Sequence, residues 1–258
     1  MTEIAFHAMP DGCRIAHRFT PGNGPTPGNG PPPGNGPTIV FLPGYMSDMA
    51  GSKATAIFDW AVRAGHACLC LDYSGCGQSD GDFADGTLSR WRDEVLALIA
   101  AKGAGPVVLV GSSMGGWLML LVALAMPERV VGMVGIAAAP DFTQWGYSAE
   151  QQASLATGAT IFEPNPYGPA PTPTHARFWA DGQTHRLLDH PIPLDCPLRL
   201  LHGQRDSDVP WEISLRLVAT LRSADVQLNL IKEGDHRLSR DGDIALILRT
   251  VAALVMPG

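Results

Sequence analysis

The chain has 258 residues, of which 45% are hydrophobic and 17% charged, and its formal net charge at pH 7 is −7. This apolar content supplies the core of one large domain or two small ones. The acidic balance argues against nucleic acid and anionic membranes as partners, since both favour cationic surfaces. No apolar run approaches the roughly 18 residues of a transmembrane segment, and the chain begins with no signal-peptide pattern.

Strand and helix patterns alternate along the chain. Segments 4–9 and 13–19 flank a Pro-Asp-Gly turn and predict a hairpin. Short apolar runs then predict buried strands at 38–42, 67–71, 106–110, 130–138, 198–201 and 226–231. Helices are expected at 52–64, 88–101, 114–126, 211–221 and 243–254. This alternation indicates an α/β fold with a mainly parallel central sheet, helices on both faces, and a site at the carboxyl ends of the strands.

Residues 21–38 contain three tandem copies of a six-residue unit that begins Pro-Gly-Asn-Gly-Pro. Glycine and proline at this density build neither a helix nor a core, so we expect a surface loop between two strands. A repeat expansion in a tolerant loop is the simpler interpretation, and a partner-binding proline-rich segment is the alternative.

The stretch 141–191 interrupts the alternation with a long excursion that contains prolines and many aromatic residues. Long excursions between core strands are usually functional or disordered, and the aromatics favour an ordered lid above the strand ends. These rings pack the lid on the body, line a substrate pocket, or do both. Three histidines of the lid, His175, His185 and His190, are candidates for substrate contact.

Residues 111–115 read G-S-S-M-G and lie between a predicted strand and a predicted helix. They match G-x-S-x-G, a sharp turn that lifts a serine clear of the sheet, and resemble the nucleophile elbow of the α/β-hydrolases. Both glycines are needed because a side chain at either position would collide with the turn. Ser113 is therefore the candidate nucleophile. Ser112 is a poor rival, because Val110 and Met114 occupy its flanking positions.

A serine hydroxyl needs a base within hydrogen-bond reach and an acid that orients this base. The α/β-hydrolases supply these residues in the order Ser, Asp or Glu, His. His236 lies between the last predicted strand and the last helix, which makes it the candidate base. Residues 201–210 resemble the family pattern H-G-x-x-D-x-x-V-P, which implies Asp206 as the acid and a structural role for His202. Asp208 is the alternative acid, although we expect it to cap the following helix.

Hydrolysis also needs N–H donors for the developing oxyanion. One is expected from Met114, the residue after the nucleophile and the first of a helix. The second is expected from Tyr45, because it follows Gly44 in the loop after strand 38–42 and glycine lets the backbone approach the substrate. The ring of Tyr45 walls the pocket or only packs.

A glycine-rich loop at 72–81 contains G-x-G, but a dinucleotide site is excluded by the spacing to a third glycine and by the lack of an immediate helix. The loop is similar to the D-x-x-G-x-G-x-S turn of α/β-hydrolases. No residues have metal-ligand spacing and no P-loop pattern occurs, so we expect neither a metal nor an organic cofactor.

The five cysteines lack the spacing of a disulfide framework, which favours a reducing compartment and predicts a cytoplasmic protein. Cys68 and Cys70 share one face of a predicted strand, as small core residues do. Cys13 and Cys196 are also interpreted as structural. Cys76, in the glycine-rich loop, is the candidate for a reactive thiol.

Several motifs together resemble one branch of the family. They are LPGY at 42–45, DYSG at 72–75, GSSMGGWLML at 111–120, LHG at 201–203, VPW at 209–211 and GDHR at 234–237. These motifs resemble the mitochondrial abhydrolase-domain palmitoyl-protein thioesterases, a branch also described as acyl-glucuronide esterases. No mitochondrial targeting segment is evident, which favours a bacterial relative.

The resemblance implies a single α/β-hydrolase domain over 1–258 and a serine hydrolase of acyl thioesters or carboxylic esters. Its substrates would be small molecules or acylated partners, cleaved through an acyl-enzyme intermediate. A carbon–carbon bond hydrolase or a peptidase could use the same three residues, and a ligand-binding module without turnover is the alternative outside enzymes.

Overall fold

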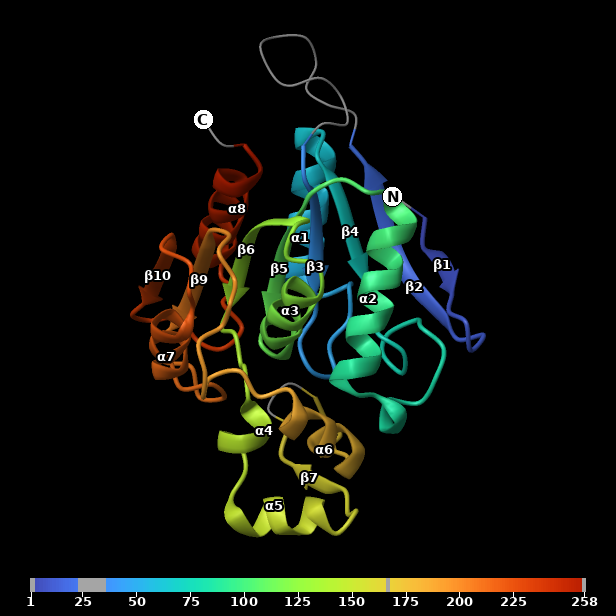
Figure 1. The fold of residues 1–258 in the computed structure, drawn as a ribbon, viewed down its shortest axis with the longest axis vertical. Coiled ribbons are helices and arrows are strands. Elements are labelled where there is room, and N and C mark those ends of the chain that lie inside the picture. Colours follow the sequence, from blue (N-terminus) through green and yellow to red (C-terminus); the bar gives the residue numbers. More distant parts are fainter. Residues whose placement is uncertain (1–2, 23–35, 166–167, 257–258) are drawn as a thin grey trace.

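The computed structural model describes residues 3–22, 36–165 and 168–256. Within these residues, eight strands form one twisted sheet (Figure 1). In spatial order they are β1 (Ala5–Ala8), β2 (Arg14–Pro21), β4 (Ala67–Leu71), β3 (Thr38–Leu42), β5 (Val107–Ser112), β6 (Val130–Ile136), β9 (Leu198–Gly203) and β10 (Val226–Ile231). Neighbours from β4 to β10 pair in parallel, and the β1–β2 hairpin adds antiparallel to β4. The predicted α/β fold, its mainly parallel sheet and the N-terminal hairpin are confirmed.

Helices cover both faces of the sheet, as the alternating pattern predicts. One face packs against α1 (Ser52–Ala64) and α8 (Asp241–Val255), whose buried residues share one hydrophobic cluster. The other face packs against α2 (Leu88–Lys102), α3 (Met114–Ala125) and α7 (Glu212–Thr220), whose residues share a second cluster (Figure 1). Central strands such as β5 are buried along their whole length, which explains why they read as continuous apolar runs.

The predicted strand over 130–138 ends earlier than expected. Strand β6 stops at Ile136 because Ala137 has a positive φ of 45°, which no strand accommodates. Strand β5 is longer than predicted and continues to Ser112, so that Ser113 follows the strand directly.

The chain between β6 and β9 forms a separate layer beyond the carboxyl ends of the strands (Figure 1). We call residues 141–191 the insertion. It contains α4 (Phe142–Trp145), α5 (Ala149–Ala156), β7 (Ile161–Glu163), β8 (Thr172–Thr174) and α6 (Ala176–Thr184). None of these elements was predicted; the capping box between Ser148 and Gln151 is the signal that could have indicated α5.

Two further segments complete the description. A short 3₁₀ helix, η1 (Phe83–Asp85), follows the glycine-rich loop. Of the repeat at 21–38, residues 23–35 lie outside the described residues, so the prediction of a surface loop is not tested there.

No helix in the described part of the chain combines the length and the apolar character needed to cross a bilayer.

Candidate active site

Ser113 occupies a strained turn between β5 and α3. Its backbone has φ 55° and ψ −122°, a conformation that residues other than glycine adopt only when the surrounding structure holds them there. A Cβ at Gly115 would lie 2.1 Å from the Leu42 carbonyl oxygen, and a Cβ at Gly111 would lie 2.3 Å from the Gly115 carbonyl oxygen. The steric requirement for both glycines is therefore confirmed.

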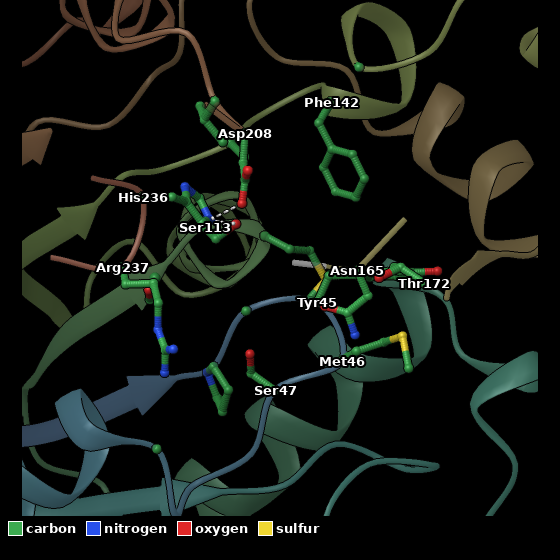
Figure 2. A pocket seen from close by; sticks show the side chains of 18 of the residues that line it. Tyr45, Met46, Ser47, Ser113, Phe142, Asn165, Thr172, Asp208, His236 and Arg237 are labelled. Atoms are coloured by element: carbon green, nitrogen blue, oxygen red, sulfur yellow. Dashed lines mark hydrogen bonds and ion pairs between the residues drawn. The ribbon is translucent and has the colours of Figure 1, made fainter. Parts of the chain in front are cut away.

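Three side chains from separate loops meet beside this turn. His236 Nε2 lies 3.1 Å from Ser113 Oγ, and His236 Nδ1 lies 2.8 Å from Asp206 Oδ2. Figure 2 shows the Ser113 and His236 side chains pointing toward each other in the pocket. The structure thus brings together the three candidates that the sequence places 93 and 30 residues apart (206 minus 113, and 236 minus 206).

Hydrogen-bond chemistry fixes the tautomer of His236. A carboxylate oxygen only accepts, so the Nδ1 atom that faces Asp206 carries the proton. The Nε2 atom is then an acceptor for the hydroxyl of Ser113. This is the arrangement in which a serine hydroxyl can lose its proton to a neighbouring imidazole.

The carboxylate of Asp206 is fully buried and well satisfied. Its Oδ1 accepts the amide protons of Asp208 (2.9 Å) and Val209 (2.8 Å), and His202 Nε2 lies 3.2 Å from its Oδ2. Burial alone would raise the pKa of Asp206, but hydrogen bonds from His202 and His236 outweigh burial and hold the pKa well below its ordinary value.

His202 has a larger part in the site than the sequence indicated. Its ring is buried, its Nδ1 lies 2.7 Å from Ser214 Oγ, and its Nε2 faces two acceptors, Asp206 and the Val209 carbonyl. Nε2 therefore carries the proton and donates toward the carboxylate. The H-G-x-x-D spacing, four residues from His202 to Asp206, was the signal for this contact.

Asp208 does not cap the following helix, and that prediction is wrong. Helix α7 begins at Glu212 with Trp211 as its N-cap and no side-chain cap, so Asp208 lies too far upstream to reach the first-turn amides. Its carboxylate instead accepts from Ser207 Oγ (3.1 Å) and lies 4.0 Å from Nε2 of the His236 ring, the nitrogen opposite to the one that faces Asp206.

The loop after β3 passes directly beside the nucleophile turn. A Cβ at Gly44 would lie 3.3 Å from the Ser113 Cβ, so the backbone before Tyr45 approaches Ser113 as closely as glycine permits. Asp72 holds this loop from the far side, because its Oδ1 accepts the Met49 amide at 2.7 Å. The ring of Tyr45 turns to the insertion, where its hydroxyl donates to the Pro173 carbonyl (3.0 Å).

The site opens into a cavity of about 690 Å³ between the sheet edge and the insertion. This volume is within the range of small-molecule sites. The aromatic and apolar part of the wall includes Tyr45, Met46, Phe142, Trp145 and Tyr147. The polar part includes Ser47, Ser52, Lys53, Arg237 and Ser239. Asn165 and Thr172 lie beside Tyr45 and Met46 (Figure 2). In Figure 2, Phe142 and Arg237 lie on opposite sides of Ser113.

Two expectations about other side chains are wrong. Of the described residues that line the cavity, none is His175, His185 or His190. His185 instead lies 2.7 Å from Ser89 Oγ and joins the insertion to α2.

Cys76 is buried, which raises the pKa of its thiol to about 12, so it is not the reactive thiolate that its loop position indicated. Among the described residues, no group of three or more His, Cys, Asp or Glu side chains is placed to hold a metal ion.

The chain belongs to the alpha/beta hydrolase family, whose model matches residues 39–253. It is 40% identical over 263 aligned residues to the human mitochondrial palmitoyl-protein thioesterase ABHD10, an alignment that covers 98% of this chain and 80% of that protein. The structure of mouse alpha/beta hydrolase domain-containing protein 10 is similar, with a TM-score of 0.86 and 36% identity over 98% of both chains. A protein from Agrobacterium vitis S4 gives a TM-score of 0.89 at 36% identity, over 98% of this chain and 100% of its own.

Proposed function

We propose that the chain is a serine hydrolase that cleaves acyl thioesters or carboxylic esters through an acyl-enzyme intermediate. The observation that carries the proposal is the row of side chains from Ser113 Oγ to His236 (3.1 Å) and from His236 to Asp206 (2.8 Å). The likeness to palmitoyl-protein thioesterases over nearly the whole chain supports acyl-transfer chemistry on a thioester or an ester.

In the proposed reaction, Ser113 Oγ attacks the acyl carbonyl carbon while His236 Nε2 takes the hydroxyl proton. The buried carboxylate of Asp206 stabilises the resulting imidazolium. The imidazolium then gives its proton to the departing thiol or alcohol, and water activated by His236 releases the acid. The amides of Met114 and Tyr45 hold the oxyanion, and each such donor contributes about 3 kcal/mol to stabilisation of the transition state.

The mixed lining of the cavity suggests an orientation for the substrate. We place the acyl chain against the aromatic residues Phe142, Trp145 and Tyr147 of the insertion, which line the site. In this proposal the insertion acts as a lid over the acyl group. The leaving group lies at the polar part of the wall, next to Ser47 and Ser239, where its oxygen or nitrogen atoms find hydrogen-bond partners.

Replacement of Ser113 by alanine tests the nucleophile. We expect Ser113→Ala to lower kcat for p-nitrophenyl esters by at least about 10⁴-fold, because no other group can form the acyl-enzyme. A fluorophosphonate probe should label the wild type and not the variant. Ser223→Ala, in the connection between α7 and β10, is the matched control and should keep full activity. Wild-type turnover in Ser113→Ala, with an unchanged circular dichroism spectrum, would exclude Ser113 as the nucleophile.

A substrate panel tests the bond type. Acyl thioesters, acyl glucuronides, short oxygen esters and peptides are compared by kcat/KM on the purified protein. We expect turnover of thioesters or oxygen esters and none of peptides. A protein that neither labels with fluorophosphonate nor hydrolyses any of these compounds would be a binding module that retains the fold.

A further inference from the structure

Lys53 connects helix α1 to the loop that carries His236. It is the second residue of α1, and its Nζ donates a 2.5 Å hydrogen bond to the backbone carbonyl of Arg237, the residue after His236. The Lys53 side chain is half-buried and lines the same cavity as Ser113. A partly buried ammonium is costly unless its contacts compensate, and the Arg237 carbonyl supplies one such contact.

The same carbonyl is the centre of a small network. Ser239 Oγ also donates to the Arg237 carbonyl (3.0 Å), and Ser52 Oγ of α1 lies 3.2 Å from Ser239 Oγ. Between them, Leu238 has a positive φ of 44° and donates its amide to Asp235 Oδ1 at 3.0 Å. The loop is therefore strained and depends on these contacts for its conformation.

We propose that Lys53 is a positioning residue, which holds the His236 loop against α1 so that Nε2 of His236 faces Ser113 Oγ. The proposal rests on the proposed hydrolase function. The Arg237 carbonyl belongs to the residue directly after His236. A shift of this carbonyl therefore moves the His236 backbone and its ring. Helix α1 directly follows the loop that contains Tyr45, so Lys53 also couples the proposed oxyanion loop to the base.

The charge of Lys53 makes this contact dependent on pH. Burial, with a smaller effect of the Arg237 cation, lowers the pKa of Lys53 to about 8, although the Asp235 and Asp206 carboxylates oppose both effects. Below pH 8 the ammonium makes a charge-assisted hydrogen bond, which is about twice as strong as a neutral one. Above pH 8 this strength is lost, so the hydrolysis rate should fall as pH rises. Other titratable groups on the cavity wall are Tyr45, Asp48, Tyr147, Glu163, Asp208 and His236.

Two substitutions separate positioning from packing. Lys53→Met keeps the length of the side chain and removes the donor, and we expect kcat to fall about 10- to 100-fold with KM little changed, because a misplacement of ~1 Å costs about 100-fold. Lys53→Arg keeps a cation that does not titrate below pH 12. It should restore much of kcat and remove the decline near pH 8. Lys102→Met is the matched control, because this lysine lies far away over the ring of Phe19, and it should leave rate and pH profile unchanged.

The test of positioning by Lys53 measures kcat and KM on a neutral p-nitrophenyl ester. Melting temperatures are measured for all variants. Wild-type kcat in Lys53→Met would overturn the proposal. A loss confined to KM would also overturn it, because Lys53 would then contact the substrate itself. If Lys53→Met does not fold, the Lys53→Arg profile decides alone, and persistence of the decline near pH 8 contradicts positioning by this ammonium. The hydrolase function fails by a different result, namely full activity in Ser113→Ala.

Discussion

At the scale of single residues, two carboxylates two positions apart have different environments. The Asp206 side chain is fully buried, whereas that of Asp208 is 33% exposed. Asp206 contacts two rings and two amides, and its lowered pKa keeps it ionised at neutral pH. Because the pKa is lower in the folded state, this carboxylate contributes stability that is present above about pH 4 and is lost on acidification. Environment, and not residue type, therefore distinguishes the two aspartates.

Paired asparagine substitutions test this distinction. Asp206→Asn should lower kcat by about 10⁴-fold, because an amide that donates to Nδ1 stabilises the wrong tautomer of His236. Asp208→Asn should lower kcat by less than about tenfold, because the Asp208 carboxylate is 33% exposed and lies 4.0 Å from Nε2, the nitrogen opposite to the one that faces Asp206. Steady-state kinetics and melting temperatures are measured for both variants. The opposite order of activities would assign the acid to Asp208.

At the scale of elements, the site depends on close contacts between the ends of strands and helices. The turn between β5 and α3 packs against the end of β3 at Gly115. The two ends of the insertion are joined to each other, because the buried carboxylate of Asp141 accepts the amides of Leu187 and Leu188 at 2.7–3.0 Å. The insertion is joined to the body where Ser89 of α2 donates to Asp181 Oδ1 (2.6 Å). These contacts fix the position of the insertion relative to the body, and so the position of the cavity walls relative to each other.

A glycine pair tests the packing at the nucleophile turn. In Gly115→Ala the new Cβ would meet the carbonyl oxygens of Leu42 and Pro43 at 2.1 and 2.4 Å, and backbone atoms there cannot yield without moving β3. We expect a loss of at least about 1–3 kcal/mol in stability and of fluorophosphonate labelling. Gly242→Ala, in the first turn of α8 with open space around it, is the matched control. It should be neutral or stabilising by up to about 1 kcal/mol. Equal melting temperatures in the two variants would contradict the steric argument.

At the scale of the whole molecule, the sheet brings distant segments to one edge. The carboxyl ends of β3, β5, β9 and β10 deliver the loops with Tyr45, Ser113, Asp206 and His236, and the insertion closes the cavity from beyond this edge (Figure 1). The same folding removes Cys68, Cys70 and Cys76 from solvent, whereas Cys13 and Cys196 stay partly exposed.

Alkylation of the native protein tests this burial. With iodoacetamide at pH 8, we expect Cys76 to react slowly, because burial raises its pKa to about 12 and leaves little thiolate. Cys68 and Cys70 should be protected by burial as well. In denaturant all five cysteines should react at similar rates. Peptide mass spectrometry follows each site, and rapid labelling of native Cys76 would contradict the structure.

The sequence by itself determined the features that depend on neighbours along the chain. The alternation of strands and helices, the glycines around Ser113 and the placement of candidate residues after strands follow from local periodicity and sterics, and the α/β architecture confirms them. Only the tertiary structure decided which contacts form between distant residues: Ser214 at Nδ1 of His202, Asp208 4.0 Å from Nε2 of His236, and Lys53 on the Arg237 carbonyl. Such contacts depend on how elements pack and on which way a side chain turns, which no spacing along the chain specifies.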